Sequence, residues 1–405
     1  MTSRYATLMT AVALIFMMAF PKAGFYFEAI PITFGYIILA LLAIAELVYR
    51  ATHGQRYLDS VVACILVLLF GFAVIEIGAF KMFGYVSFGG AIAIVVSTLV
   101  VPILSMLATS LLLRSLGTDG YIRALRWSLL IVFCFGCVSF IAYNTIQLAI
   151  GVPYLTTTGD DLSVVFERHN MRTNVVKMFS TYNNGNILGI NLLLWGPIAA
   201  CGTQRSLKSA LAFRTICVLS LSRSVWAGLV AFEMIGAFMD RSLSRIYRAC
   251  FTAVLLIVVV VVVSLAIGHD PMKFLLDRDL GGRMSTLQGE LDVISQRSVG
   301  WNSESIYAGA YLAFGPIGVV MVIVTWSIPV LFGGKTPLQQ TARLACLVYL
   351  LIGAIEGAFL LVPTQAVYWS VATLALMPPT STEAKREVAS RLTTLRPRQT
   401  FVYSE

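Results

Sequence analysis

The stretch LSLSRSVWAGL, residues 219–229, places an arginine between two long apolar runs. As one helix, residues 209–239 would be roughly 46 Å long, although about 30 Å of helix spans the hydrocarbon core of a bilayer. An arginine at the centre of such a helix costs about 2.5–3.5 kcal/mol of insertion free energy. A turn at Ser222–Arg223–Ser224 that joins two short helices avoids both problems.

The composition is that of a polytopic membrane protein. Of the 405 residues, 58% are hydrophobic and only 12% are charged, whereas soluble domains carry about 25% charged residues. The net charge of +9 is attributed to loops near lipid head groups and to membrane orientation, so no nucleic-acid partner is expected. All seven cysteines lie in apolar segments, which argues against a disulfide framework.

The distribution of Lys and Arg decides between the broken and the unbroken helix, because cytoplasmic loops are enriched in these residues. With a turn at Arg223 and a cytoplasmic N-terminus, most of the 29 cations lie on the cytoplasmic side, whereas an unbroken helix reverses this bias. We therefore predict an all-α membrane domain over residues 1–379 with about twelve helices, both termini cytoplasmic, and a basic cytoplasmic tail at 380–405. The predicted membrane helices are 5–20, 32–48, 60–80, 90–113, 127–150, 185–202, two short helices within 209–239, 250–268, 306–331, 341–361 and 365–377.

Two outer loops, about 151–184 and 269–305, are much longer than the other connections. Long loops in compact proteins are usually functional. Together with Arg223 they hold most of the cations on the outer side, and two interpretations remain open. The loop arginines pair with acids of the same loops, or they bind an anion at the outer membrane surface, since Arg binds phosphate in a bidentate manner.

Four segments follow one another in a characteristic order: an Asn-Gly-Asn loop, a membrane pair broken by Ser-Arg-Ser, an Arg-rich outer loop and the helix after it. They are STYNNGNILGINLLLWGP (180–197), LSLSRSVWAGL (219–229), GGRMSTLQGELDVI (281–294) and SVGWNSESIYAGAYLAFGPIGVV (298–320). This order resembles the bacterial O-antigen and exopolysaccharide polymerases (Wzy-type) and the related O-antigen ligases. The resemblance covers about 180–320 and implies the GT-C-like helical fold of that polymerase and ligase family.

The resemblance implies a glycosyltransferase of polysaccharide biosynthesis that uses no cofactor and no metal. Its donor would be an oligosaccharide linked to undecaprenyl diphosphate in the membrane. The acceptor would be a second lipid-linked repeat unit in a polymerase, or lipid A core in a ligase. Transfer would occur at the periplasmic face of the bacterial inner membrane, with a chain-length regulator and an export complex as further partners.

Several site residues are implied by the same resemblance. Arg223 matches the arginine of the Ser-Arg-Ser turn and is the candidate diphosphate clamp, with Arg283 in the second loop as its catalytic partner. Arg278 fits an R-x10-G pattern with Gly289, whereas the corresponding spacing after Arg172 in the first loop is two residues too long. The remaining candidates for substrate binding are Asn184, Asn186, Tyr182 and Trp301. The two aromatic side chains offer faces to sugars, although outer-interface aromatics also serve as membrane anchors.

Glu304 is the first candidate for the catalytic base. The ligases have a His-Asn pair eleven residues before a Gly-x-x-Gly, and Glu304 and Ser305 occupy these positions before Gly315. A glutamate can accept the proton of a sugar hydroxyl, and the missing histidine favours the polymerase over the ligase. Asp279 and Glu290 are the next candidates. A second role, as an acid at a helix start, stays open and is compatible with the first.

A twelve-helix transporter or a flippase for the lipid-linked oligosaccharide is the rival interpretation. Three acids lie within apolar segments, Glu76, Glu233 and Glu356, and a carrier could use them for proton coupling. Because the cations are assigned to loops, these acids are expected to lack a cationic partner. Against a carrier, the halves of the chain show no similarity to each other, which repeat-built transporters often have. The sequence therefore predicts a polysaccharide polymerase, with the ligase and the flippase as alternatives.

Overall fold

The computed structural model is mostly helical, as expected from the sequence. It describes residues 4–27, 30–54, 60–83, 95–158, 162, 165–166, 170–172, 175–201, 206–240, 243–267, 305–356, 358 and 361–377. The tail predicted at 380–405 and most of the predicted loop at 269–305 lie outside these residues.

Helices form nearly all of the described chain. They are α1 (Arg4–Ala19), α2 (Phe34–Thr52), α3 (Ser60–Phe83), α5 (Val101–Ile146), α6 (Gly185–Cys201), α7 (Leu207–Leu219), α8 (Arg223–Asp240), α9 (Leu243–Ile267), α12 (Ile306–Phe332), α13 (Pro337–Ile352) and α14 (Val362–Leu376). A π-helix, Val96–Val100, leads into α5, and a 3-10 turn, Ser180–Tyr182, precedes α6. Two short antiparallel hairpins were not predicted, β1 (Gly24–Phe27) with β2 (Ile30–Thr33) and β3 (Met171–Arg172) with β4 (Val175–Val176).

The predicted turn at Ser222–Arg223–Ser224 is confirmed. Helix α7 ends at Leu219, and α8 begins at Arg223. Between them Leu221 adopts a left-handed backbone conformation with φ of 49°, which a residue with a branched side chain adopts only when its surroundings impose it. The indole of Trp226 supplies such a constraint, because its Nε1 donates a hydrogen bond to the carbonyl of Val218 across the turn, at 3.0 Å.

One predicted loop is absent. Helices were expected at 90–113 and 127–150 with a loop between them, and α5 consists of two helical parts that meet directly at a kink at Gly117. Gly117 has φ of 67° and ψ of 168°, a conformation that is accessible only to a residue without a side chain. The residues on both sides, RSL and YIRALR, are good helix formers. One glycine therefore changes the direction of the chain where a whole loop was expected.

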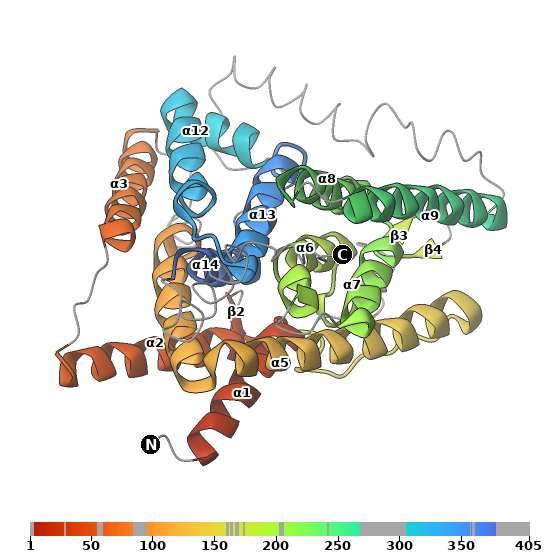
Figure 1. Cartoon of the computed structure of the whole chain (residues 1–405), viewed down its shortest axis with the longest axis horizontal. Coiled ribbons are helices and arrows are strands. Elements are labelled where there is room, and N and C mark those ends of the chain that lie inside the picture. The colour runs from red at the N-terminus through yellow and green to blue at the C-terminus, as the bar shows by residue number, and fades with distance from the viewer. Residues whose placement is uncertain are drawn as a thin grey trace, which may run out of the picture.

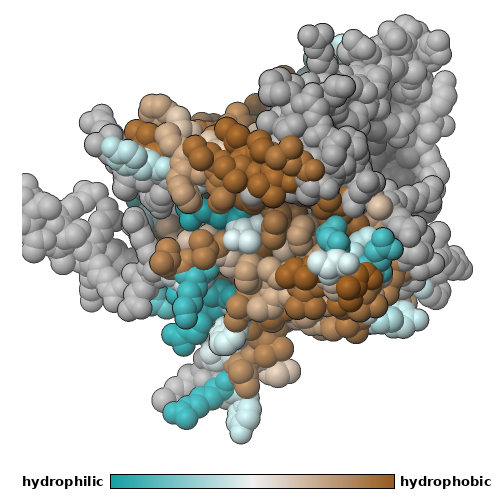
Figure 2. All heavy atoms as spheres, turned by 90° about the vertical axis from the view of Figure 1, so that its right-hand side faces the viewer, coloured by the Kyte–Doolittle hydropathy of each residue, from teal (hydrophilic) through white to brown (hydrophobic). Residues whose placement is uncertain are grey.

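Three described helices are long and apolar enough to cross a bilayer, Phe34–Thr52, Val96–Ile146 and Phe314–Phe332. Further helices are apolar but shorter, among them α1 and α6. Apolar side chains cover much of one face of the molecule (Figure 2), and α9 exposes a row of them: Val254, Ile257, Val258, Val262 and Leu265. The chain is thus a helical membrane protein, whereas the number of twelve spans, the GT-C-like fold and the cytoplasmic termini remain predictions.

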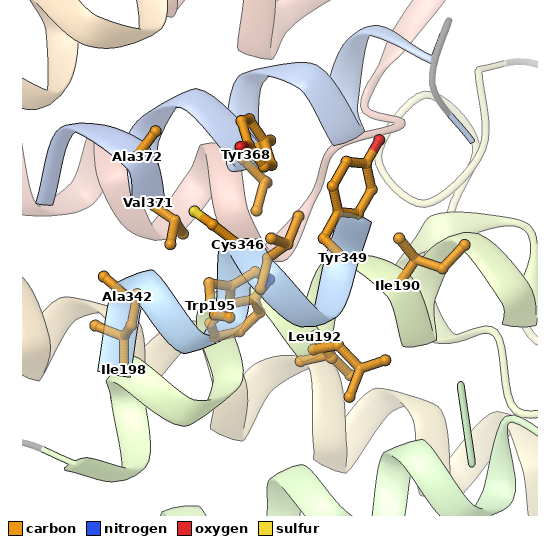
Figure 3. Packing of buried hydrophobic residues seen from close by; sticks show 14 of the residues in the cluster. Ile190, Leu192, Trp195, Ile198, Ala342, Cys346, Tyr349, Tyr368, Val371 and Ala372 are labelled. Atoms are coloured by element: carbon orange, nitrogen blue, oxygen red, sulfur yellow. The ribbon is translucent and has the colours of Figure 1, made fainter. Parts of the chain in front are cut away.

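The core lies between α6, α13 and α14 in the middle of the molecule, with α5 along the lower side and α8 and α9 along the upper side (Figure 1). Helix α6 is buried over almost its whole length. Figure 3 shows Trp195 of α6 close to Cys346 of α13, with Tyr349 of α13 and Tyr368 of α14 in the same cluster. The hydroxyl of Tyr368 donates to the carbonyl of Trp326, so the aromatic core is also hydrogen-bonded to α12.

Hydrogen bonds between segments distant in sequence form two sets. The first contains Gly24 N to Tyr154 O at 2.9 Å, Met178 N to Leu219 O at 2.9 Å and Ile306 N to Gly353 O at 2.7 Å. The second contains Arg126 Nε to Ala199 O at 2.9 Å, Gly334 N to Ala375 O at 2.8 Å and Cys201 Sγ to Thr341 Oγ1 at 3.2 Å. In the topology with a turn at Arg223, each of these bonds joins residues on the same side of the membrane. The contact between Cys201 and Thr341 distinguishes the two topologies, because an unbroken helix would place these residues on opposite sides of the membrane.

Buried acids have partners of different kinds. Glu46, fully buried in α2, binds Arg50 at 2.6 Å and Arg114 of α5 at 2.8 Å. Glu233 of α8 binds Arg214 of α7. The expectation that Glu233 lacks a cationic partner is therefore wrong, because Arg214 lies within α7 rather than in a loop.

Replacing Glu46 by Gln removes the buried charge that neutralises Arg50 and Arg114. We expect Glu46→Gln to lose about 2 kcal/mol or more of stability, because removing one partner of a buried ion pair leaves the other uncompensated. The measurement is thermal unfolding of the purified protein in detergent. Arg123→Gln removes an exposed charge from the same helix, α5, and should leave the melting temperature unchanged. Equal melting curves for Glu46→Gln and the wild type would contradict this role.

Candidate functional site

The structure describes the side chains of four of the nine predicted site residues. The backbone of Arg172 lies in β3, where it pairs with Val175, but its side chain is not described. The described four are Arg223, Asn184, Asn186 and Tyr182, and outside the described residues lie Glu304, Arg283, Arg278 and Trp301.

The start of α6 and the turn between α7 and α8 meet at one place, which we call the Arg223 corner: Lys177, Met178, Asn183–Asn186 and Ser220–Ser224. The segment after β4 joins the turn through Met178 N, which donates to Leu219 O. Gly185, the first residue of α6, packs so tightly that a side chain there would lie 3.0 Å from Cβ of Lys177 and 3.2 Å from the carbonyl oxygen of Ser220. Glycine therefore lets these segments meet without displacing the backbone of either neighbour.

Asn184 and Asn186 organise the start of α6. The side chain of Asn184 accepts hydrogen bonds from the backbone N–H groups of Asn186 at 2.8 Å and Ile187 at 3.2 Å, as a helix N-cap does. The side chain of Asn186 accepts a hydrogen bond from Nζ of Lys177 at 3.2 Å. Lys177 is thereby held beside the helix start. It was not among the predicted site residues, because nothing in its sequence context distinguishes it from the other loop cations.

The Arg223 corner concentrates positive charge. The N-termini of α6 and α8 both lie there, and each carries the partial positive charge of a helix dipole and of N–H groups without helical partners. Lys177 and Arg223 add two full charges. A cation in the first turn of a helix opposes the dipole by about 0.3–1 kcal/mol, so Arg223 gains most when an anion lies next to it. Helix starts of this kind are suited to phosphate groups.

Asn183 adds a buried polar side chain to the corner. Its backbone is left-handed, with φ of 59°. Both polar atoms of its side chain are buried, and neither has a hydrogen-bond partner among the residues that the structure describes. Burying an unsatisfied amide costs about 1–3 kcal/mol, and unsatisfied buried polar groups in native structures often mark functional sites. A polar ligand at the corner would satisfy this side chain.

Glu356 also reaches the corner, although it is 132 residues away from it along the chain. Its Oε2 accepts a hydrogen bond from the hydroxyl of Ser224 at 2.6 Å, and Oγ of Ser224 lies 2.9 Å from Oγ of Ser222. From the sequence, Glu356 was only an apolar-segment acid that favoured a carrier. Its place at the site follows from the hydrogen bond to Ser224, which is far away in sequence, and no local sequence pattern reveals such a contact.

The chain after the second long loop comes to the same region. Ile306 N donates to the carbonyl of Gly353 at 2.7 Å, and the hydroxyl of Ser305 caps the start of α12. Gly353 precedes Glu356 by three residues. The residue that follows Glu304 is thus held against the segment that carries Glu356.

Tyr182 has a structural role in the protein interior. Its side chain is almost fully buried, and its hydroxyl donates to the carbonyl of Met18 at 2.8 Å. Burial raises the pKa of Tyr182 above its ordinary value. In this structure the ring ties the first long loop to the end of α1 and has no face exposed for a sugar.

Asn170 holds the first long loop in shape and was missed from the sequence. It is fully buried, its Nδ2 donates to the carbonyls of Val165 at 2.7 Å and Asn183 at 2.9 Å, and its Oδ1 accepts from Gly185 N at 2.9 Å. Its own carbonyl accepts from Lys177 N at 2.9 Å. Asn170 therefore holds the backbone of Lys177, Asn183 and Gly185, all of which belong to the Arg223 corner. From α5, Asn144 holds β4 through two hydrogen bonds with the backbone of Val176, at 2.9 and 3.2 Å.

No family model, no curated protein and no solved structure matches this chain. The resemblance to the polymerases and ligases accordingly rests on the four sequence segments given above. The Arg223 corner is independent of it, because it is built from distances and hydrogen bonds alone.

Replacing Asn170 by Ala removes three hydrogen bonds and leaves buried backbone groups at Val165, Asn183 and Gly185 without that partner. We expect Asn170→Ala to loosen residues 170–185 while the helical core stays folded, because each stranded buried group costs about 1–3 kcal/mol. Hydrogen–deuterium exchange of peptides from this loop should speed up at least tenfold. Thr145→Val, at an exposed position of α5, is the control. Unchanged exchange in the loop of Asn170→Ala would show that other contacts fix it.

Proposed function

We propose that this protein is a polysaccharide polymerase that joins oligosaccharide repeat units linked to undecaprenyl diphosphate. It acts at the periplasmic face of the bacterial inner membrane and releases undecaprenyl diphosphate. The observation that carries the proposal is the Arg223 corner, where Arg223, Lys177 and two helix starts gather positive charge at a turn between membrane helices.

The corner suits the leaving group of this reaction. When the hydroxyl of the acceptor attacks the anomeric carbon of the donor, negative charge accumulates on the departing diphosphate. Fixed positive charge at that position lowers the barrier. Arg223 is the clamp for the diphosphate, and Arg172, Arg278 and Arg283 of the long loops are its proposed partners. The chemistry supplied by these groups is electrostatic and uses no metal and no cofactor.

The proposed topology places the corner at the level of the outer lipid head groups. With both termini in the cytoplasm, the turn at Arg223, the first long loop and the start of α12 belong to the periplasmic side. A diphosphate can then bind at the corner while its polyprenyl tail stays in the bilayer. A carrier lipid of this kind enters sideways from the membrane, so no soluble nucleotide sugar is needed.

Two alternatives use the same face of the membrane. A ligase would transfer the glycan to lipid A core, and Glu304 in place of the ligase histidine favours the polymerase. A flippase or transporter would move the lipid-linked oligosaccharide without forming a bond. Against proton coupling by the three apolar-segment acids, Glu233 is neutralised by Arg214.

The first measurement is the length of surface glycan in a strain that lacks the gene and carries a plasmid copy. We expect long chains with the wild type and single repeats with Arg223→Ala at equal membrane abundance. Arg223→Lys should restore chains only in part, because an ammonium group cannot bind phosphate in a bidentate manner. Arg123→Ala, which removes an exposed cation outside the corner, should give chains of normal length.

The outcome of this experiment also separates the alternatives. Normal chains with Arg223→Ala would exclude the clamp. Long chains that remain linked to the carrier lipid in the deletion strain would indicate a ligase. Repeats trapped inside the cell would indicate a flippase.

A further inference from the structure

We propose that Glu356 accepts the proton of the attacking hydroxyl through the hydroxyls of Ser224 and Ser222. This inference rests on the proposed glycosyl transfer and assigns its proton path. The two serines flank Arg223 at the start of α8, and Glu356 follows α13. Glu304, the base predicted from the sequence, is the competing proton acceptor.

The hydrogen bonds give this chain of groups a direction. Ser224 Oγ donates to Glu356 Oε2 at 2.6 Å, and Ser222 Oγ lies 2.9 Å from Ser224 Oγ. A hydroxyl carries a single hydrogen. Since the hydrogen of Ser224 is directed at the carboxylate, Ser222 is the donor to Ser224. The chain therefore runs from Ser222 to Glu356, and the oxygen of Ser222 keeps the capacity to accept a further hydrogen bond.

Burial protects this path. The exposed fractions are 3% for Ser222, 2% for Ser224 and 7% for Glu356. A proton on Ser224 is therefore passed to the carboxylate instead of being exchanged with bulk water, and hydrogen bonds in such surroundings are stronger than in water. Because Ser222 is itself buried, the acceptor hydroxyl has to approach it from the side of the neighbouring Arg223, which is only partly buried.

The position of Arg223 between the serines links the proton path to the clamp. Ser222 provides the carbonyl that accepts the first helical hydrogen bond of α8, from Trp226 N at 3.0 Å, so its place relative to Arg223 is fixed by the helix start. An acceptor hydroxyl at Ser222 and a diphosphate at Arg223 would be held by consecutive residues. This explains why the arginine of the turn is flanked by hydroxyl side chains.

The proposed step balances. The acceptor oxygen forms a bond to the anomeric carbon, and the bond from that carbon to the diphosphate oxygen breaks with its electron pair leaving on the diphosphate. The acceptor proton passes to Ser222, the proton of Ser222 to Ser224 and the proton of Ser224 to Glu356. Both serines are neutral before and after the step. Glu356 then returns its proton to the departing diphosphate or to water.

The test uses the full chain in lipid nanodiscs, with lipid-linked repeats extracted from the deletion strain as the substrate. We expect Glu356→Gln to lower kcat by about 100-fold or more, the usual size of a general-base contribution, with KM for the lipid-linked repeat within about twofold. Ser224→Ala should lower kcat at least tenfold. Ser224→Thr keeps the hydroxyl and should restore most of the rate, which a purely structural role of the serine does not predict.

Two matched controls are available in the chain. Glu76, a buried acid of α3, likewise accepts a hydrogen bond from a hydroxyl on another helix, Thr98 at 2.9 Å, and Glu76→Gln should keep kcat. Ser139 is a buried serine of α5 whose hydroxyl has no partner within the described part of the chain, and Ser139→Ala should keep kcat as well. Melting temperatures in detergent identify any variant that fails to fold.

Four results would overturn the proposal. One is wild-type kcat in Glu356→Gln together with an inactive Glu304→Gln, which would make Glu304 the base. Another is equal loss in Ser224→Thr and Ser224→Ala with a lowered melting temperature, which would make the contact structural. A third is equal loss in Glu76→Gln, which would make the effect common to buried acids. An inactive wild-type protein would remove the proposed function itself and the proton path with it.

Discussion

The unfavourable transfer of a guanidinium group into hydrocarbon is the constraint on which this structure depends. Because Arg223 lies in the middle of an apolar stretch of 31 residues, 209–239, the chain has to turn there. That turn determines on which side every later helix ends. It also brings a helix start, and therefore a concentration of N–H groups, to the arginine. The same residue that breaks the apolar stretch thus creates the charge of the proposed site.

The parts of the fold that follow from local pattern were predictable. Apolar length placed α1, α2, α6 and α12 within a few residues, and charge bias placed the turn at Arg223. The direct junction of the two helical parts of α5 was not predictable, because a positive φ at one glycine replaced a loop that composition alone suggests. The hairpin of β1 and β2 was missed because its four-residue strands are too short to give a pattern.

The site was predictable only in part, for a different physical reason. Arg223 and the Asn-Gly-Asn stretch carry local signals, namely a cation in an apolar run and a cluster of capping residues. Asn170 and Glu356 carry none, because their importance lies in hydrogen bonds to partners 5–15 and 132 residues away. The sequence around a buried acid does not show whether the acid pairs with an arginine, as Glu233 does, or accepts a hydrogen bond from a serine, as Glu356 does. Only the packing of helices distinguishes these cases.

The kink at Gly117 divides α5 into two helical parts. On one side of the kink Arg114 is anchored to Glu46 of α2, and on the other side a helical segment of roughly 40 Å reaches Asn144, which holds the backbone of β4 just before Lys177. One helical element thus joins the buried ion pair of Glu46 to the strand that precedes Lys177, and its bend lies at Gly117. Because Gly117 has a positive φ, a residue with a side chain there would strain the backbone, and relief of that strain would change the angle between Arg114 and Asn144 along α5.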